Sequence, residues 1–202
     1  MALTLVPTTE LEAVNSMLLA IGEAPVAQLE NSGLGDAATA RSRLTLVSRR
    51  VQKRGWSWNT DYNLSLPIDS NGYVNLPNDC LRFNPTGAFD QAKLVQRGTQ
   101  VYDAWNNTFV FTTTLTADVV HFLDFSILPE TARQAILLAA TVDFQAGFVA
   151  SDSLDKFILR DAQMAWAELI SDEVENLDCN IFTDDLGMVQ NLSRTNSTWW
   201  LS

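Results

Sequence analysis

The hydrophobic pattern changes twice along the chain, and this change limits the fold more than any other feature. Towards both ends, apolar residues recur every three or four positions, which is the spacing of one helix face. Between about residues 56 and 126, short apolar runs are broken by turn signals, a pattern typical of strands. Because an amphipathic helix must bury its apolar face against another element, we expect the terminal helices to pack together.

The first two predicted helices have clear boundaries. Thr9 with Glu12 forms a capping-box pattern, and Gly22 is a natural stop for the helix that follows. A second helix is predicted over 37–54 and ends at Gly55. Its apolar stripe consists of Ala40, Leu44, Val47 and Val51.

The middle segment predicts several short strands. Trp56 and Trp58 alternate with polar residues, and Asn71-Gly72 is a strong hairpin signal. Further short strands are predicted at 73–76, 93–96, 101–102, 109–111 and 119–125.

The last third returns to helical spacing. Pro129 suits the first turn of a helix that Gly147 can end, and another helix is predicted over 153–176. The predicted fold class is therefore α+β: a four-helix bundle with a small antiparallel β domain inserted between the second and third helices, and an extended C-terminal tail. The predicted parts are residues 1–55 and 127–176 for the bundle, 56–126 for the insert and 177–202 for the tail.

Composition excludes several classes of protein. The net charge of −11 argues against a free-standing nucleic-acid binder, which needs a net basic footprint. Cys80 and Cys179 lie too far apart for a CxxC redox site, and we expect both to be free thiols. His121, the single histidine, lies in an apolar strand-like run, where a structural role is more common than a catalytic one. No secretory signal or membrane span is expected, and the sequence predicts no metal site, no cofactor and no enzyme.

Charge is distributed unevenly. The second predicted helix carries six of the 13 basic residues and no acid after Asp36, whereas residues 152–185 carry ten acids and two bases. The six basic residues are Arg41, Arg43, Arg49, Arg50, Lys53 and Arg54. These faces are either solvated, with a few pairs inside the bundle, or they are surfaces through which identical copies pack head to tail. The residues alone leave both interpretations open.

Several segments, taken in order, resemble tail tubular protein A, the head-to-tail adaptor or gatekeeper of short-tailed podophages. The strongest is Val51-Gln52-Lys53-Arg54-Gly55-Trp56-Ser57-Trp58-Asn59. The others include Ile21-Gly22-Glu23-Ala24-Pro25-Val26, Leu76-Pro77-Asn78-Asp79-Cys80-Leu81-Arg82 and Leu128-Pro129-Glu130 with Ala132-Arg133. The likeness covers most of the chain and ends at Asn180-Ile181-Phe182.

This resemblance implies a structural virion protein made in the host cytoplasm. It implies a dodecameric ring that joins the portal protein to the tail nozzle protein, tail tubular protein B, and continues the channel through which DNA passes without specific binding. The six basic residues become candidates for a subunit or portal interface. The tail would grip the portal, with Ile181, Phe182, Trp199 and Trp200 as apolar anchors.

Two other functions remain open on the sequence. A virion-associated peptidoglycan or glycan hydrolase needs two carboxylates beside a cleft, and Glu168 with Asp172 is one such pair at helical spacing. A DNA-binding module could use the basic helix together with Trp56 and Trp58, because tryptophans can stack on bases. The tryptophans are more typical of an anchor between helix and sheet.

Overall fold

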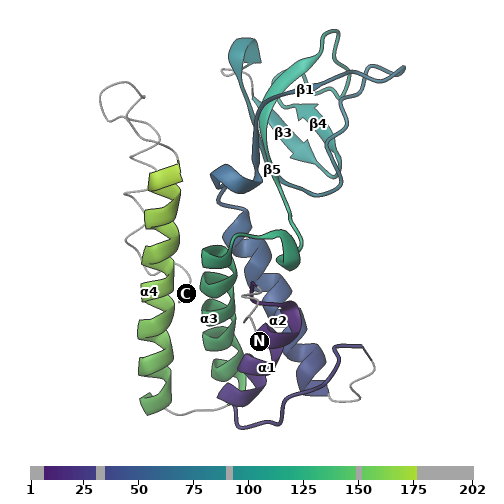
Figure 1. Ribbon diagram of the computed structural model, residues 1–202. Coiled ribbons are helices and arrows are strands. Elements are labelled where there is room, and N and C mark those ends of the chain that lie inside the picture. The colour runs from purple at the N-terminus through teal and green to yellow at the C-terminus, as the bar shows by residue number, and fades with distance from the viewer. Residues whose placement is uncertain (1–6, 31–34, 90–92, 149–151, 177–202) are drawn as a thin grey trace, which may run out of the picture. The chain divides into compact units, whose positions relative to one another are not determined.

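The computed structural model describes residues 7–30, 35–89, 93–148 and 152–176. Four helices and two small antiparallel sheets make up these ranges, and the sheets lie between the second and third helices in the sequence, which confirms the α+β fold class (Figure 1). The predicted tail, Cys179 and the four apolar anchors at 181, 182, 199 and 200 lie outside the described residues. The four-part division by residue range remains a prediction.

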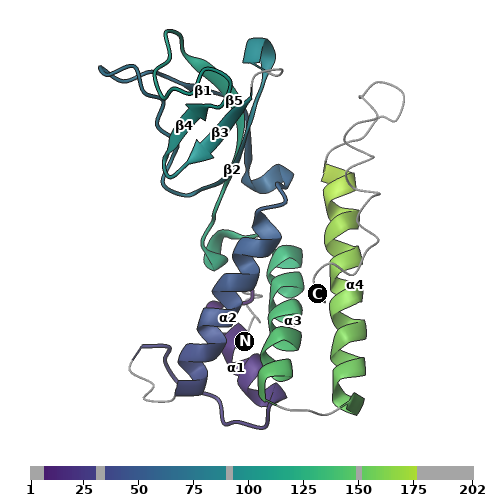
Figure 2. The ribbon, with the colours of Figure 1, turned by 180° about the vertical axis from the view of Figure 1, so that it is seen from behind.

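The chain forms two compact units. One combines residues up to Ser48 with those from Phe125 onward, and the other is Arg49–Asp124. The helices are α1 (Glu10–Ala20), α2 (Gly35–Gln52), α3 (Glu130–Phe148) and α4 (Asp152–Asn176). Within the helical unit, α3 packs against α4 on one side and against α1 on the other (Figures 1 and 2).

Small side chains let the helices approach closely. The face of α3 that meets its neighbours includes Ala132, Ala135 and Ala140, with Ile136 and Phe144 filling the space between them. The buried side of α4 is formed mainly by Ala162, Ala165 and Leu169. Because burying apolar surface is the main favourable term in folding, this contact with α3 is what holds α4 in the helical unit.

The predicted ends of α1 are confirmed. The Thr9 hydroxyl accepts the backbone N–H of Glu12 at 3.2 Å, and the Glu12 carboxylate accepts the backbone N–H of Thr9 at 2.8 Å, which is the reciprocal capping box. The stripe predicted for α2 is buried in full. Gly55 follows α2 with a φ of +81°, a backbone conformation that other residues rarely adopt.

The second unit, Arg49–Asp124, which we call the β unit, is built around a three-stranded antiparallel sheet in the order β1-β5-β2. Its strands are β1 (Thr60–Leu66), β2 (Cys80–Pro85) and β5 (Leu115–His121). A separate hairpin pairs β3 (Leu94–Arg97) with β4 (Gln100–Asp103), close to the strand segments predicted at 93–96 and 101–102. The apolar core of this unit consists of Leu66, Val74, Leu76, Val101, Leu115, Ala117 and Val119.

Several predicted strand segments are corrected. Trp56 and Trp58 do not belong to a strand, because Ser57–Asn59 forms a short 3-10 helix. Residues 73–76 and 109–111 form only isolated bridges: Tyr73 pairs with Val110, but Val74 pairs with Ile68, so no ladder develops. Strand β2 is not predicted from the sequence. It directly follows Pro77-Asn78-Asp79, a segment whose residues indicate the end of a strand. Helix α3 continues through Gly147 to Phe148 instead of ending there.

Further 3-10 turns cover Gly87–Phe89 and Phe125–Ile127. None of the helices in the described ranges is both long and apolar enough to cross a bilayer.

Candidate functional site

The six basic residues predicted as an interface have different surroundings. Arg41 belongs to the helical unit and forms a two-point ion pair with Glu10 of α1, with N–O distances of 2.9 and 3.2 Å. The hydrogen bond and charge of Glu10 raise the pKa of Arg41. This residue therefore ties α2 to α1, and its partner is not on α4.

Arg49 and Arg54 lie against aromatic rings. The Arg49 guanidinium lies 5.6 Å from the centre of the Phe122 ring, and that of Arg54 lies 5.8 Å from the centre of the Trp56 ring, both within the range of cation–π attraction. Burial lowers the pKa of Arg54, which is half-buried. Arg50 is also half-buried, whereas Arg43 and Lys53 are exposed.

Two buried amides anchor the end of α2 to the sheet. The Gln52 side chain donates to the carbonyl oxygen of Leu123 at 2.9 Å and accepts the N–H of the same residue at 2.7 Å. The Asn59 side chain accepts the backbone N–H of Trp56 and donates to the carbonyl oxygens of Gln52 and His121. These bonds satisfy backbone groups that burial would otherwise leave unpaired.

Gly55 also lies close to the sheet, so a side chain there would require its neighbours to move. A Cβ atom placed on it would come within 2.5 Å of a guanidinium nitrogen of Arg82 and 3.0 Å of a methyl group of Val120. The residues following α2 therefore pass very close to the sheet.

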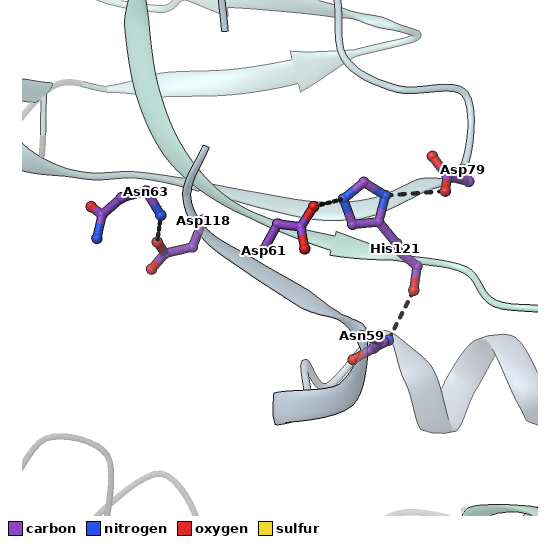
Figure 3. Close-up of polar contacts among 6 residues, drawn as sticks. All are labelled: Asn59, Asp61, Asn63, Asp79, Asp118 and His121. Carbon is purple, nitrogen blue, oxygen red and sulfur yellow. Dashed lines mark hydrogen bonds and ion pairs between the residues drawn. The ribbon is translucent and has the colours of Figure 1, made fainter. Parts of the chain in front are cut away.

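The single histidine lies between two carboxylates (Figure 3). One ring nitrogen of His121, Nδ1, lies 3.0 Å from the Asp79 carboxylate, and Nε2 lies 3.4 Å from that of Asp61. The ring is 16% exposed and links β5 to β1 and to the residue before β2. A catalytic base needs one ring nitrogen directed at a nucleophile. Because both nitrogens face aspartates that hold the strands, this geometry favours the structural role.

The neighbouring bulge of β1 is held in a similar way. Asn63 has a φ of +52°, and its backbone N–H donates to the Asp118 carboxylate of β5 at 2.9 Å (Figure 3). Next to His121 in the register, Cys80 of β2 is a free thiol whose pKa is raised by burial. Across the described ranges, no group of three or more His, Cys, Asp or Glu side chains is arranged to hold a metal ion.

The tryptophans anchor the junction. Trp56 is 2% exposed, and its indole N–H donates to the carbonyl oxygen of Val51 at 2.9 Å. Its ring stacks on that of Trp58, with centroids 6.1 Å apart and planes 8° apart. A nucleic-acid base could not stack on the covered ring of Trp56, and this argues against the DNA-binding interpretation.

The acidic residues of α4 whose side chains the structure describes differ in exposure. Glu168 and Glu175 are exposed, Asp161 and Asp172 are partly buried, and Glu173 is buried. The pair Glu168 and Asp172, considered as hydrolase carboxylates, therefore lies on a largely solvated side of a helix. Asp161 forms an ion pair with its neighbour Arg160 at 3.0 Å.

Comparison with known proteins decides the family. A family model described as tail tubular protein matches residues 11–178. The chain belongs to the tail tubular protein family. No curated protein matches it. The chain is thus a structural component of a phage tail, where it assembles with other tail proteins.

The family match also covers buried polar positions that residue patterns alone did not single out. Gln52, Asn59 and Arg133 are buried polar residues inside matched segments. Arg133 donates to the carbonyl oxygens of Thr8, Ser126 and Leu128 at 2.6–2.9 Å, so it fixes the N-terminal entry to α1 beside the start of α3. The only signal for these residues was their place in the family-like segments, because hydrophobic periodicity carries no information on buried amides.

Proposed function

We propose that this chain is a head-to-tail adaptor that forms a ring, dodecameric by resemblance to tail tubular protein A. The ring would join the portal to the tail nozzle protein and continue the DNA channel for genome retention and ejection. The observation that carries this proposal is the family match over residues 11–178. The separation of basic α2 from acidic α4 supports it, because copies with two unlike charged faces favour head-to-tail contacts.

In this proposal α2 contacts a neighbouring subunit or the portal. Arg43 and Lys53 are exposed and available for such contacts, whereas Arg41 is already held by Glu10. Residues 177–202 would grip the portal.

The net charge of −11 has a role in a channel. A basic wall would retain DNA by releasing condensed counterions, whereas an acidic wall repels phosphate and lets the duplex slide. We propose that part of the excess acid lines the channel. If reversal of these charges left the rate of DNA ejection unchanged, the proposed lining would be wrong.

Microscopy of the purified chain, with and without its portal, tests the ring. We expect closed rings by negative stain, at least on the portal, and loss of these rings when Arg49 and Arg50 are both changed to Glu. The variant Lys93→Glu with Arg97→Glu changes the net charge equally at exposed positions of the β unit and serves as the control. Normal rings from the α2 variant would count against an interface on α2. If the wild-type chain formed no ring even with the portal, the proposed adaptor function would be wrong.

A further inference from the structure

One residue in the middle of the solvent-exposed face of α2 is apolar. Leu46 is 52% exposed, although the predicted apolar stripe of the same helix is buried. Arg43 and Arg49 each lie one turn from Leu46 on the same side of the helix. Lys53 directly follows the last residue of α2, where its N–H still bonds the carbonyl oxygen of Arg49, and all three side chains are exposed. We call these four residues the basic face. An apolar side chain surrounded by charges has the composition of an interface centre with a polar rim.

The solvent face of α4 has the matching composition. Phe157 and Met164 are 63% and 64% exposed. Glu168 follows Met164 by one turn and Glu175 follows Glu168 by two turns, on the same side of the helix, and both are exposed as well. We call these four residues the acidic face. Because α4 contacts α3 through the opposite side, Met164 stays largely exposed in the described part of the chain, whereas the guanidinium of Arg160 lies over the Phe157 ring, 5.9 Å from its centre.

The two faces belong to different helices, α2 and α4. In both views α3 lies between α4 and the part of α2 that belongs to the helical unit, which ends at Ser48 (Figures 1 and 2). A chain with two complementary faces separated in this way can satisfy both only through other molecules. If these molecules are copies of itself, the contact is heterologous and repeats from copy to copy.

We propose that the acidic face of α4 binds the basic face of α2 in a second copy of this chain. This inference rests on the proposed ring and names the contact that builds it. Leu46 and Met164 meet at the dry centre, where apolar burial contributes most, and the charged residues pair around them. The net charge of −11 makes copies repel one another in other orientations, so the opposite charges select this register.

Charge also favours a second copy over the chain's own C-terminal segment as the partner of the acidic face. The first part of that segment carries Asp178, Asp184 and Asp185, and would bring acids against an acidic face. Like charges placed opposite each other in an interface are unfavourable. A second copy supplies cations instead.

A mixing experiment tests the pairing. Variant A carries Arg43→Glu and Lys53→Glu, and variant B carries Glu168→Lys and Glu175→Lys. Each has two faces of the same sign, so each alone should fail to form the wild-type oligomer in sedimentation velocity and negative stain. An equal mixture should assemble, because every contact between A and B has opposite charges. Lys93→Glu with Arg97→Glu and Glu23→Lys with Glu30→Lys are the matched controls at exposed positions elsewhere.

Disulfide capture gives a readout that does not depend on stable rings. In full-length chains with Cys80→Ser and Cys179→Ser, a chain carrying Leu46→Cys is oxidised together with one carrying Met164→Cys at high concentration. The mixed disulfide should exceed either same-site disulfide by about tenfold, and the charge changes of variant A should abolish this excess.

The outcomes separate the two proposals. Wild-type rings on the portal that survive in variants A and B would overturn the α2–α4 contact and leave the adaptor standing. Absence of an excess of the mixed disulfide would also overturn the contact. If A or B assembles on the portal but loses contact with copies of itself, the portal is the true partner of that face. Capture of Met164→Cys by a cysteine placed at Trp199 would assign the acidic face to the C-terminal segment instead.

Discussion

Replacing Asn59 with alanine should weaken the β unit more than any change at its surface. The side chain is 3% exposed and makes three hydrogen bonds to backbone groups, at 2.8, 3.0 and 2.8 Å. Its partners are the N–H of Trp56 and the carbonyl oxygens of Gln52 and His121. One amide therefore joins the end of α2, the 3-10 turn and the end of β5.

The magnitude follows from these bonds. A hydrogen bond contributes about 1 kcal/mol net, and a buried backbone group left unpaired costs about 1–3 kcal/mol. With three such groups, some of which water can reach after the change, we expect a loss of about 3–5 kcal/mol in the free energy of unfolding. This is a large part of the stability of a typical domain.

Guanidinium unfolding followed by tryptophan fluorescence measures the loss, and amide hydrogen exchange shows whether it falls within Arg49–Asp124. Asn78→Ala, at an exposed asparagine of the same unit, is the control and should change stability by less than about 0.5 kcal/mol. A loss below about 1 kcal/mol for Asn59→Ala would refute the reasoning.

The related change Asn59→Asp tests the direction in which stability should depend on pH. The new carboxyl keeps an acceptor for the N–H of Trp56 but directs an oxygen at two carbonyl groups. Burial and these carbonyls should raise its pKa in the folded state above the unfolded value, so it binds more protons when folded. The stability of this variant, relative to wild type, should therefore improve as the pH falls from neutral towards the unfolded pKa.

Three further results are expected. Gly55→Ala should lower the melting temperature and cost more than about 1–2 kcal/mol, because a φ of +81° is strained for alanine and its Cβ would meet Arg82. Arg133→Met should release the segment at Thr8, seen as faster limited proteolysis there, because three carbonyl oxygens lose their donor; unchanged proteolysis would contradict this. Hydrogen bonds from Asn106 hold the pKa of Asp103 below its usual value. The turn that Asp103 braces should therefore persist on acidification through the usual aspartate pKa and loosen only below it, as judged from amide NMR shifts of that turn; a midpoint at or above the usual value would argue against it.

Helix positions could be predicted from the sequence because they depend on local signals. The capping box at Thr9 and the stop at Gly55 each act within one or two turns, and both are found where the pattern predicts them. The strand register could not be predicted in the same way. Tyr73 and Val74 have strand-like side chains, but each pairs with a different segment, and such choices depend on long-range packing.

The candidate site likewise has features that the sequence predicts and features that only the structure shows. The charge difference between the second and last helices is visible in the composition, and the exposure of Arg43, Lys53 and Glu168 agrees with it. Exposure of Leu46 and Met164 is a three-dimensional property, since the sequence does not show which side of a helix lacks a neighbour. The role of Gln52 was hidden because a polar residue beside an apolar stripe is usually solvated.

The bidentate bond between Gln52 and Leu123 has a consequence for how the chain folds during synthesis. It joins residues 71 positions apart at the two ends of the β unit, so the chain enters and leaves this unit at neighbouring points. The helical unit is assembled from segments on both sides of this insertion and must wait until the later one is made. If the β unit folds first, it replaces a long flexible loop by a short connection and reduces the entropy cost of closure by roughly 2 kcal/mol. The order of translation and the hydrogen bonds of one glutamine would then act together to bring the later helices to the earlier ones.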